Sequence, residues 1–305
     1  MIVAENLSRS FGSLRAVDDL SFQVDQGEVF GLLGPNGAGK TTTVRLLTCL
    51  IRPTGGTAYV GGLKVGEENK RIRGMVGILT ENPGLYERLS AYRNLELFTE
   101  LYGLSREEGH RQVKKYLEML GLWERREEAV ARFSKGMRQK IAIARALVHE
   151  PRILFLDEPT AALDPEAAKT VRDFVLQLRR EKRTILICTH NLDEAEGLCD
   201  RLGIIKTRLL QVDSLRNLRT RLYGRRVEIR LRKLEDGIAE RVRDLTFVRG
   251  VEVTGNSLLV ALDDPEENNP EMVRLIIERG GQIVFVQELR PSLERVYLDV
   301  VRGSS

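Results

Sequence analysis

The sequence lacks several features that would place the protein in a specialised class. None of its apolar runs reaches the roughly 18 residues that a membrane-spanning helix needs, and its first residues lack the long apolar stretch of a signal peptide. We therefore expect the chain to stay in the cytosol. Three cysteines (Cys49, Cys188 and Cys199) and three histidines are too few to indicate a disulfide framework or a histidine-rich metal site. We expect the cysteines to be reduced core residues.

The composition that is present belongs to a globular protein. Of the 305 residues, 42% are hydrophobic and 30% are charged, which excludes disordered and collagen-like chains, and the length predicts about two domains. The net charge of +4 is too small by itself to indicate nucleic-acid binding. Residues 201–250 hold 14 Lys and Arg against 6 Asp and Glu. This basic stretch is either solvated surface or a face near anionic lipid headgroups.

Residues 34–41 fit the phosphate-binding pattern G-x-x-x-x-G-K-[ST] without a gap. They follow a short apolar run at 29–34 that is typical of a buried strand, and a helical pattern continues through Leu50. Glycines in such a loop let backbone N–H groups turn towards phosphate oxygens, and the following helix presents its positive N-terminus. Lys40 would bridge the β- and γ-phosphates, and Thr41 would ligate Mg²⁺. The expected nucleotide contacts are Gly34, Pro35, Asn36, Gly37, Ala38, Gly39, Lys40, Thr41 and Thr42.

Two acidic residues follow a second apolar run, at 153–156. The end of a strand would place Asp157 beside the phosphate loop, where it can hold Mg²⁺ through water, and Glu158 could polarise the attacking water. A helical pattern at 165–181 and a further apolar run at 184–189 complete a β-α-β unit. Such a unit predicts a parallel sheet, so we expect an α/β fold.

The remaining patterns divide the chain into parts. Periodicity of 3.6 residues over 86–150 predicts a helical subdomain. After Gly224 we expect strands at 226–232, 248–254, 257–262 and 282–288, helices at 235–245 and 270–279, and a last helix after Pro291. The order β-α-β-β-α-β is that of a small ferredoxin-like α+β domain. We therefore expect two domains, at 1–223 and 224–305.

The order of these motifs over about residues 1–220 resembles the ATP-binding subunits of ABC transporters. Besides the phosphate loop and the acidic pair, it includes the helix start Phe133-Ser134-Lys135-Gly136-Met137, then Ala162-Leu163-Asp164, then Thr189-His190. The resemblance implies a P-loop NTPase with a RecA-like parallel sheet core and a helical subdomain. It also implies ATP hydrolysis with Mg²⁺ by a two-fold symmetric homodimer. This homodimer would drive separate integral membrane permease subunits from the cytoplasmic face of the cell membrane.

The resemblance also implies roles for individual residues. Phe11 would stack on adenine, with a core phenylalanine as the alternative. Ser134 and Gly136 would meet the γ-phosphate of the ATP bound by the partner subunit, and Asp164 would lie in the loop that links the two sites. His190 would join Glu158 in catalysis as the switch histidine at the γ-phosphate, with a core histidine as the alternative.

Three positions depart from the family's pattern. Lys135 replaces a glycine of the signature. Glu81 stands where the family has a glutamine, and its carboxylate could bind Mg²⁺ directly or leave that role to Asp157. Phe11 keeps the ring of the usual tyrosine, which is all that stacking requires.

The C-terminal residues and the helical subdomain indicate which partners we expect for the protein. Residues 225–305 resemble the C-terminal domain of ATPase subunits from drug, sodium and polysaccharide-type exporters, which implies export; a small oligomerisation domain is the alternative. Candidates for the surface that docks the membrane subunits are Leu85, Tyr86, Leu89 and Tyr92, unless they pack locally. The rival function is a soluble ABC-type ATPase acting on nucleic acid or ribosomes. The chain has one ATPase unit and no long heptad coiled coil, so we expect no nucleic-acid partner.

Overall fold

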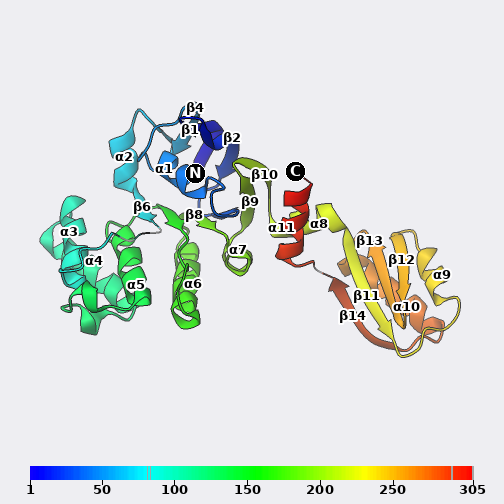
Figure 1. Cartoon of the computed structure of the whole chain (residues 1–305). Coiled ribbons are helices and arrows are strands. Elements are labelled where there is room, and N and C mark those ends of the chain that lie inside the picture. The colour runs from blue at the N-terminus through cyan, green and yellow to red at the C-terminus, as the bar shows by residue number, and fades with distance from the viewer. Residues whose placement is uncertain (81, 83, 290, 304–305) are drawn as a thin grey trace. The chain divides into compact units, whose positions relative to one another are not determined.

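The computed structural model describes residues 1–80, 82, 84–289 and 291–303. They form two compact units, Met1–Asp213 with Gly303, and Ser214–Arg302 (Figure 1). The units divide ten residues before the 223/224 boundary expected from the sequence, because helix α8 (Leu215–Tyr223) packs against α11 (Leu293–Arg302) in the second unit. In the described part of the chain, no helix combines the length and the apolar character that crossing a membrane requires.

A six-stranded sheet forms the centre of the first unit. Its strand order is β10-β9-β3-β8-β7-β6; the strands from β9 to β6 are parallel, and β10 is an antiparallel edge strand. The strands are β3 (Val29–Leu33), β6 (Val76–Leu79), β7 (Ile153–Asp157), β8 (Thr184–Thr189), β9 (Arg201–Lys206) and β10 (Arg208–Asp213). Because β3, β7 and β8 are buried along their whole length, their continuous apolar runs suit a sheet covered on both faces. The α/β fold with a parallel core is confirmed, including the unit formed by β7, α6 (Pro165–Arg180) and β8.

A smaller antiparallel sheet with the order β2-β1-β4-β5 lies beside this core. Its strands are β1 (Ile2–Phe11), β2 (Leu14–Val24), β4 (Gly55–Val60) and β5 (Leu63–Lys64), and the short helix α2 (Asn69–Met75) follows. Helix α1 (Lys40–Leu47) joins the two sheets, since its buried Val44 and Leu46 share one hydrophobic cluster with Leu20 of β2 and Phe155 of β7.

The helical subdomain contains α3 (Ala91–Leu101), α4 (Arg106–Met119) and α5 (Lys135–Leu147), with short 3₁₀ turns at Trp123–Arg125 and Val130–Arg132. A serine caps each helix: the side chains of Ser90, Ser105 and Ser134 accept a hydrogen bond from a backbone N–H of the first turn. Its core is continuous with one face of the parallel sheet, because Leu95, Tyr116 and Ile141 belong to the same hydrophobic cluster as Leu154 of β7.

The second unit contains a four-stranded antiparallel sheet with the order β12-β13-β11-β14. Its elements between α8 and α11 are β11 (Arg225–Leu231), α9 (Ile238–Arg243), β12 (Val248–Thr254), β13 (Ser257–Leu262), α10 (Pro265–Glu278) and β14 (Ile283–Leu289). This is the predicted ferredoxin-like order. Helix α10 begins earlier than expected, because Asp264 caps it by accepting hydrogen bonds from the N–H groups of Glu266 and Glu267, and Pro265 occupies its first turn.

Candidate nucleotide-binding site

The phosphate loop connects β3 to α1, and two of its glycines are required by the space around them. A Cβ atom on Gly34 would lie 2.3 Å from the carbonyl oxygen of Ile205. Gly39 has a φ of +97°, and a Cβ atom there would lie 2.5 Å from the carbonyl oxygen of Ala16. The loop is therefore held close against neighbouring backbone, in a conformation that other residues rarely adopt. The first N–H groups of α1 have no carbonyl partner within the helix, which suits an anionic ligand at this end.

A chain of polar contacts links the loop to both predicted catalytic residues. Lys40 Nζ donates hydrogen bonds to the carbonyl oxygens of Gly34 (2.6 Å) and Pro35 (3.2 Å), and it lies 3.2 Å from Glu158 Oε1. The second carboxylate oxygen of Glu158 hydrogen-bonds to His190 Nδ1 at 2.9 Å. Since Lys40 is buried, the carboxylate of Glu158 compensates its charge. A triphosphate would offer the ammonium group stronger partners.

The carboxyl ends of three parallel strands, β3, β7 and β8, create this arrangement, and the phosphate loop follows β3. Asp157 is the last residue of β7 and pairs with Cys188 of β8, while His190 directly follows β8. The backbone N–H of Glu158 donates to the carbonyl oxygen of Cys188 at 2.8 Å, and the residue has a φ of +51°. Positive φ is uncommon outside glycine and often marks functional positions. The sharp bend starts directly after β7, at the residue whose carboxylate faces Lys40.

A cavity of about 560 Å³ surrounds the loop. The residues that line it include Phe11, Leu14 and Ala16, positions 35–42 of the loop, and Glu158, Ala161 and His190. Phe11 is 44% exposed and the His190 side chain is 53% exposed, so neither is the core residue that the alternative interpretations require. The guanidinium group of Arg9 lies 4.5 Å from the centre of the Phe11 ring. The guanidinium group thus lies over the ring of a residue that lines the cavity.

Ser134, Gly136 and Asp164 form a separate group at the starts of α5 and α6. Ser134 Oγ accepts a hydrogen bond from Met137 N at 3.2 Å, and Asp164 Oδ1 accepts one from Ala167 N at 2.8 Å. A Cβ atom on Gly136 would lie 2.8 Å from Ala167 Cβ and 3.9 Å from Asp164 Oδ2. Among the described residues that line the loop cavity, none belongs to this group. Within one chain, the predicted ATP contacts thus fall into two groups.

The oxygen ligands predicted for Mg²⁺ are present in part. Thr41, the second residue of α1, lines the loop cavity, whereas Asp157 ends β7 directly before Glu158, is 1% exposed and is not among the described residues that line the cavity. Glu81, the third predicted ligand, lies outside the described residues. The described residues hold no group of three or more His, Cys, Asp or Glu that could bind a metal ion. These donors fit Mg²⁺, which proteins commonly bind through one or two side chains together with phosphate oxygens.

The four residues proposed for docking differ in their surroundings. Leu85 and Tyr92 pack against the hydrophobic cluster of the helical subdomain. Tyr86 and Leu89 are 52% and 37% exposed. Tyr86 and Leu89 are therefore the more exposed pair, and Leu85 and Tyr92 are partly buried.

Sequence reasoning missed two buried polar residues next to the site. Gln139 Nε2 donates to the carbonyl oxygen of Pro159 at 2.8 Å, and Glu194 is 1% exposed in helix α7 (Leu192–Leu198). An acidic residue in the first turn of a helix is ordinary in a sequence. The position of Glu194 four residues after His190 could have drawn attention to it. The burial of Glu194, however, depends on how β8 and α7 pack, which the sequence pattern does not show.

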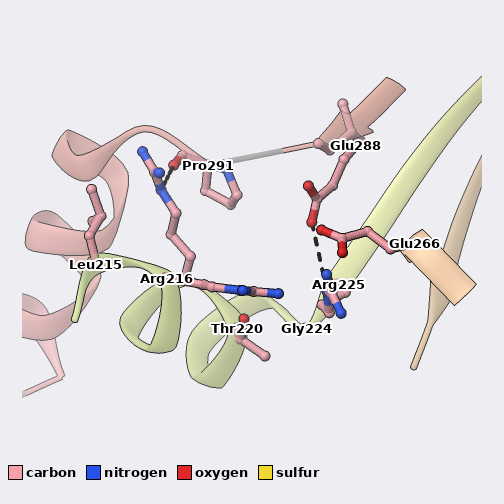
Figure 2. Close-up of a pocket in the computed structure, with 10 residues that line it drawn as sticks. Leu215, Arg216, Thr220, Gly224, Arg225, Glu266, Glu288 and Pro291 are labelled. Atoms are coloured by element: carbon pink, nitrogen blue, oxygen red, sulfur yellow. Dashed lines mark hydrogen bonds and ion pairs between the residues drawn. The ribbon is translucent and has the colours of Figure 1, made fainter. Parts of the chain in front are cut away.

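The second unit contains a cavity of its own, of about 260 Å³, between α8, β11, β14 and the start of α10 (Figure 2). Arg225 pairs there with Asp264 at 2.8 Å and lies 3.7 Å from Glu288, and Arg219 Nε donates to the carbonyl oxygen of Pro291 at 2.6 Å. The described lining has mixed charge, which suits a phosphate ligand less than the loop of the first unit does.

Comparison with known proteins defines the class. Residues 17–161 match the ABC transporter family, and residues 214–301 match the C-terminal domain of DrrA1-3-like ATP-binding proteins. The linearmycin resistance ATP-binding protein LnrL of Bacillus subtilis is 32% identical over 98% of both chains. The daunorubicin resistance ATP-binding protein DrrA3 of Streptomyces coeruleorubidus is 34% identical over 97% of this chain and 94% of its own.

Solved structures agree with this class. The ATP-binding subunit of an ABC transporter superposes with a TM-score of 0.68 at 32% identity, over 73% of this chain and 94% of that chain. A dimeric ATP-binding cassette in a post-hydrolysis state, bound to ADP and Pi, gives 0.65 at 26% identity, over 70% of this chain and 98% of its own. The chain therefore belongs to the ATP-binding proteins of ABC transporters. It is an ATPase with a P-loop fold, as the resemblance implied.

Proposed function

We propose that this ATP-binding protein powers a membrane exporter, as a homodimer that binds two ATP·Mg²⁺ and drives separate membrane subunits from the cytoplasmic face of the membrane. The observation that carries the proposal is the division of the predicted ATP contacts into two groups that do not share a cavity. A head-to-tail dimer brings the loop group of one chain to the helix-start group of the other. Export is supported by relatives that are named for drug resistance and that match both units of the chain.

Hydrolysis on this proposal uses the contacts around Glu158. Lys40 leaves its carbonyl partners for the β- and γ-phosphates, and the Glu158 carboxylate orients and polarises the attacking water. His190, which hydrogen-bonds to Glu158, is exposed and can reach the γ-phosphate from the cavity wall. Thr41 and Asp157 would hold Mg²⁺, which supplies positive charge to the phosphates when it is bound.

The partner subunit supplies the second half of each site. The N-terminus of α5 carries about half a unit of positive charge, and Ser134 can add a hydrogen bond to the γ-phosphate. Lys135 is exposed at the same helix start, so a full positive charge lies close to this surface.

The alternative function, a soluble ATPase acting on nucleic acid or ribosomes, does not explain a second unit that matches DrrA-like proteins.

Mixed dimers test the shared site. Lys40→Ala and Ser134→Arg should each abolish ATPase activity in homodimers, because each damages both sites. In a heterodimer of the two variants, one site carries both defects and the other carries neither. Verified heterodimers should therefore recover ATPase activity or, if one intact site cannot turn over alone, occlude one ATP per dimer. Ser105→Arg is the matched control, since Ser105 also caps an exposed helix start in the same subdomain but has no role in the proposed site.

One outcome would contradict the shared site, and a second would show that the arginine substitution is not a specific test of it. Heterodimers that neither hydrolyse nor occlude ATP would refute the contribution of Ser134 from the partner subunit. Loss of activity in the Ser105→Arg homodimer would show that an arginine at any helix cap of the subdomain is damaging. Co-purification of membrane subunits in mild detergent, rather than nucleic acid or ribosomes, separates the exporter from its rival.

A further inference from the structure

Glu194 is a carboxylate buried directly behind the catalytic pair. It lies in the first turn of α7, four residues after His190, and is 1% exposed. Burial raises the pKa of this carboxyl group, and the charge of Glu158 raises it further, while hydrogen bonds from Thr189 and Thr160 lower it. The mechanism proposed above does not use this group. A buried carboxylate is unfavourable unless its oxygens are hydrogen-bonded, so the partners of Glu194 indicate what it does.

These partners come from the two segments that carry catalytic residues. Thr160 Oγ1 donates a hydrogen bond to Glu194 Oε1 at 2.8 Å, and Thr160 lies two residues after Glu158. The second hydroxyl belongs to Thr189, the last residue of β8, which directly precedes His190. Both threonines are buried. One carboxylate thus connects the segment after β7 to the segment after β8.

The two segments joined by Glu194 carry Glu158 and His190, and the proposed hydrolysis depends on the contact between these two side chains. Glu158 and His190 hydrogen-bond at 2.9 Å, and Glu158 also lies 3.2 Å from Lys40 Nζ. The positive φ of Glu158 places its side chain on a bent segment whose position neighbouring contacts must hold. The start of α7 is fixed in turn, because Asn191 Oδ1 accepts a hydrogen bond from Glu194 N at 3.1 Å and Asn191 N donates to Thr189 Oγ1 at 3.0 Å.

We propose that Glu194 is a positioning residue for ATP hydrolysis: by accepting the hydrogen bond of the Thr160 hydroxyl and by its link through Asn191 to Thr189, it fixes Glu158 and His190 at the separation seen here. The inference rests on the proposed function, because it presumes that these two residues act on the water and the γ-phosphate. Glu194 does not line the nucleotide cavity, so its removal should affect turnover rather than nucleotide binding. A displacement of about 1 Å at a catalytic group can lower the rate about a hundredfold.

The test compares pairs of variants in the full-length protein. Glu194→Ala and Thr160→Val remove the acceptor and the donor, and we expect each to lower kcat tenfold or more, with roughly the same KM and affinity for a fluorescent ATP analogue. Glu194→Gln keeps one acceptor oxygen, and Thr160→Ser keeps the donor hydroxyl. Both variants should therefore retain most of the activity. The double variant Thr160→Val/Glu194→Ala should be no slower than the worse single variant. Asp193→Asn, on the exposed side of the same helix, is the matched control.

Each outcome decides between specific alternatives. A kcat of Glu194→Ala within about twofold of wild type overturns the inference, as does equal damage by Glu194→Gln accompanied by a lower Tm, which indicates a purely structural role. If the alanine variant does not fold, Thr160→Val against Thr160→Ser carries the same comparison. Glu158→Gln is measured in parallel: if it retains turnover, the proposed function of Glu158 fails, whereas its inactivity together with a fully active Glu194→Ala refutes this inference alone.

Discussion

Replacement of Glu158 by glutamine tests the centre of the proposed mechanism with a small change in shape. The amide keeps one oxygen that can accept a hydrogen bond, so the contacts to Lys40 and His190 lose charge more than geometry. It cannot act as a base at neutral pH. The structure therefore predicts opposite effects on binding and on turnover.

The size of each effect follows from the site. A positioned general base contributes about 10²–10⁴-fold to rate, so kcat should fall by this factor, which corresponds to about 2.7–5.4 kcal/mol in the barrier. Nucleotide affinity should hold or rise. In wild type, the phosphates compete with the Glu158 carboxylate for Lys40, whose side chain is only 6% exposed. Removing this competitor should tighten binding by up to about tenfold, or about 1.4 kcal/mol.

Phosphate release and nucleotide affinity are measured on purified protein, and gel filtration with ATP follows the dimers that should accumulate when hydrolysis stops. Glu166→Gln is a suitable control, since Glu166 is an exposed glutamate in the first turn of α6. Turnover by Glu158→Gln within about threefold of wild type would refute the reasoning and make His190 the next candidate. Loss of nucleotide binding would show instead that the carboxylate supports the loop.

Two further predictions concern the parts of the chain that the site geometry does not cover. Glu81→Gln should retain most of the ATPase activity, because a carboxylate beside the phosphates adds like charge unless it ligates the metal; a loss of Mg²⁺ affinity above about tenfold, roughly 1.4 kcal/mol, would show that Glu81 is a required ligand. A chain that ends at Asp213 should fold and bind a fluorescent ATP analogue with unchanged affinity, since Lys40, Glu158 and His190 all lie in the first unit; a lost thermal unfolding transition would show that the first unit depends on the second.

The sequence was most informative where one chemical requirement restricts the residue type. The phosphate loop needs glycine at Gly34 and Gly39 because backbone atoms occupy the space of a side chain, so its pattern survives in the sequence. The strands β3, β7 and β8 were recognisable because burial on both faces requires continuous apolar runs. The helix start at Ser134 and the β-α-β-β-α-β order identified α5 and the second unit for similar local reasons.

Other features depend on contacts between distant segments and could not be predicted. Strands β1 and β2 pair with several register shifts, and these interrupt the two-residue alternation of buried and exposed positions on which strand prediction depends. They nevertheless carry Phe11 to the cavity. From the sequence, the residues of helix α8 were expected in the first domain. The contact of α8 with α11 joins segments about 75 residues apart, so the sequence pattern could not reveal it. The hydrogen bond between Thr160 and Glu194 likewise joins residues that are 34 positions apart in the sequence.

The electrostatics of the single chain explain why the proposed site needs a partner. Without nucleotide, Glu158 and two carbonyl oxygens already compensate the buried Lys40, so the loop half is close to balanced. A triphosphate stays net negative even when Mg²⁺ compensates part of its charge, and it binds beside Glu158 and the buried Asp157 on this proposal. One lysine with a helix N-terminus does not offset the remaining negative charge. The group at Ser134 and Gly136 brings a second helix N-terminus, and Lys135 beside it is a cation on an exposed surface. Loss of the γ-phosphate removes the charge that these groups face across the dimer. On the proposed function, hydrolysis therefore weakens the contact between the two chains, and the same residues that complete the site make its opening depend on the reaction.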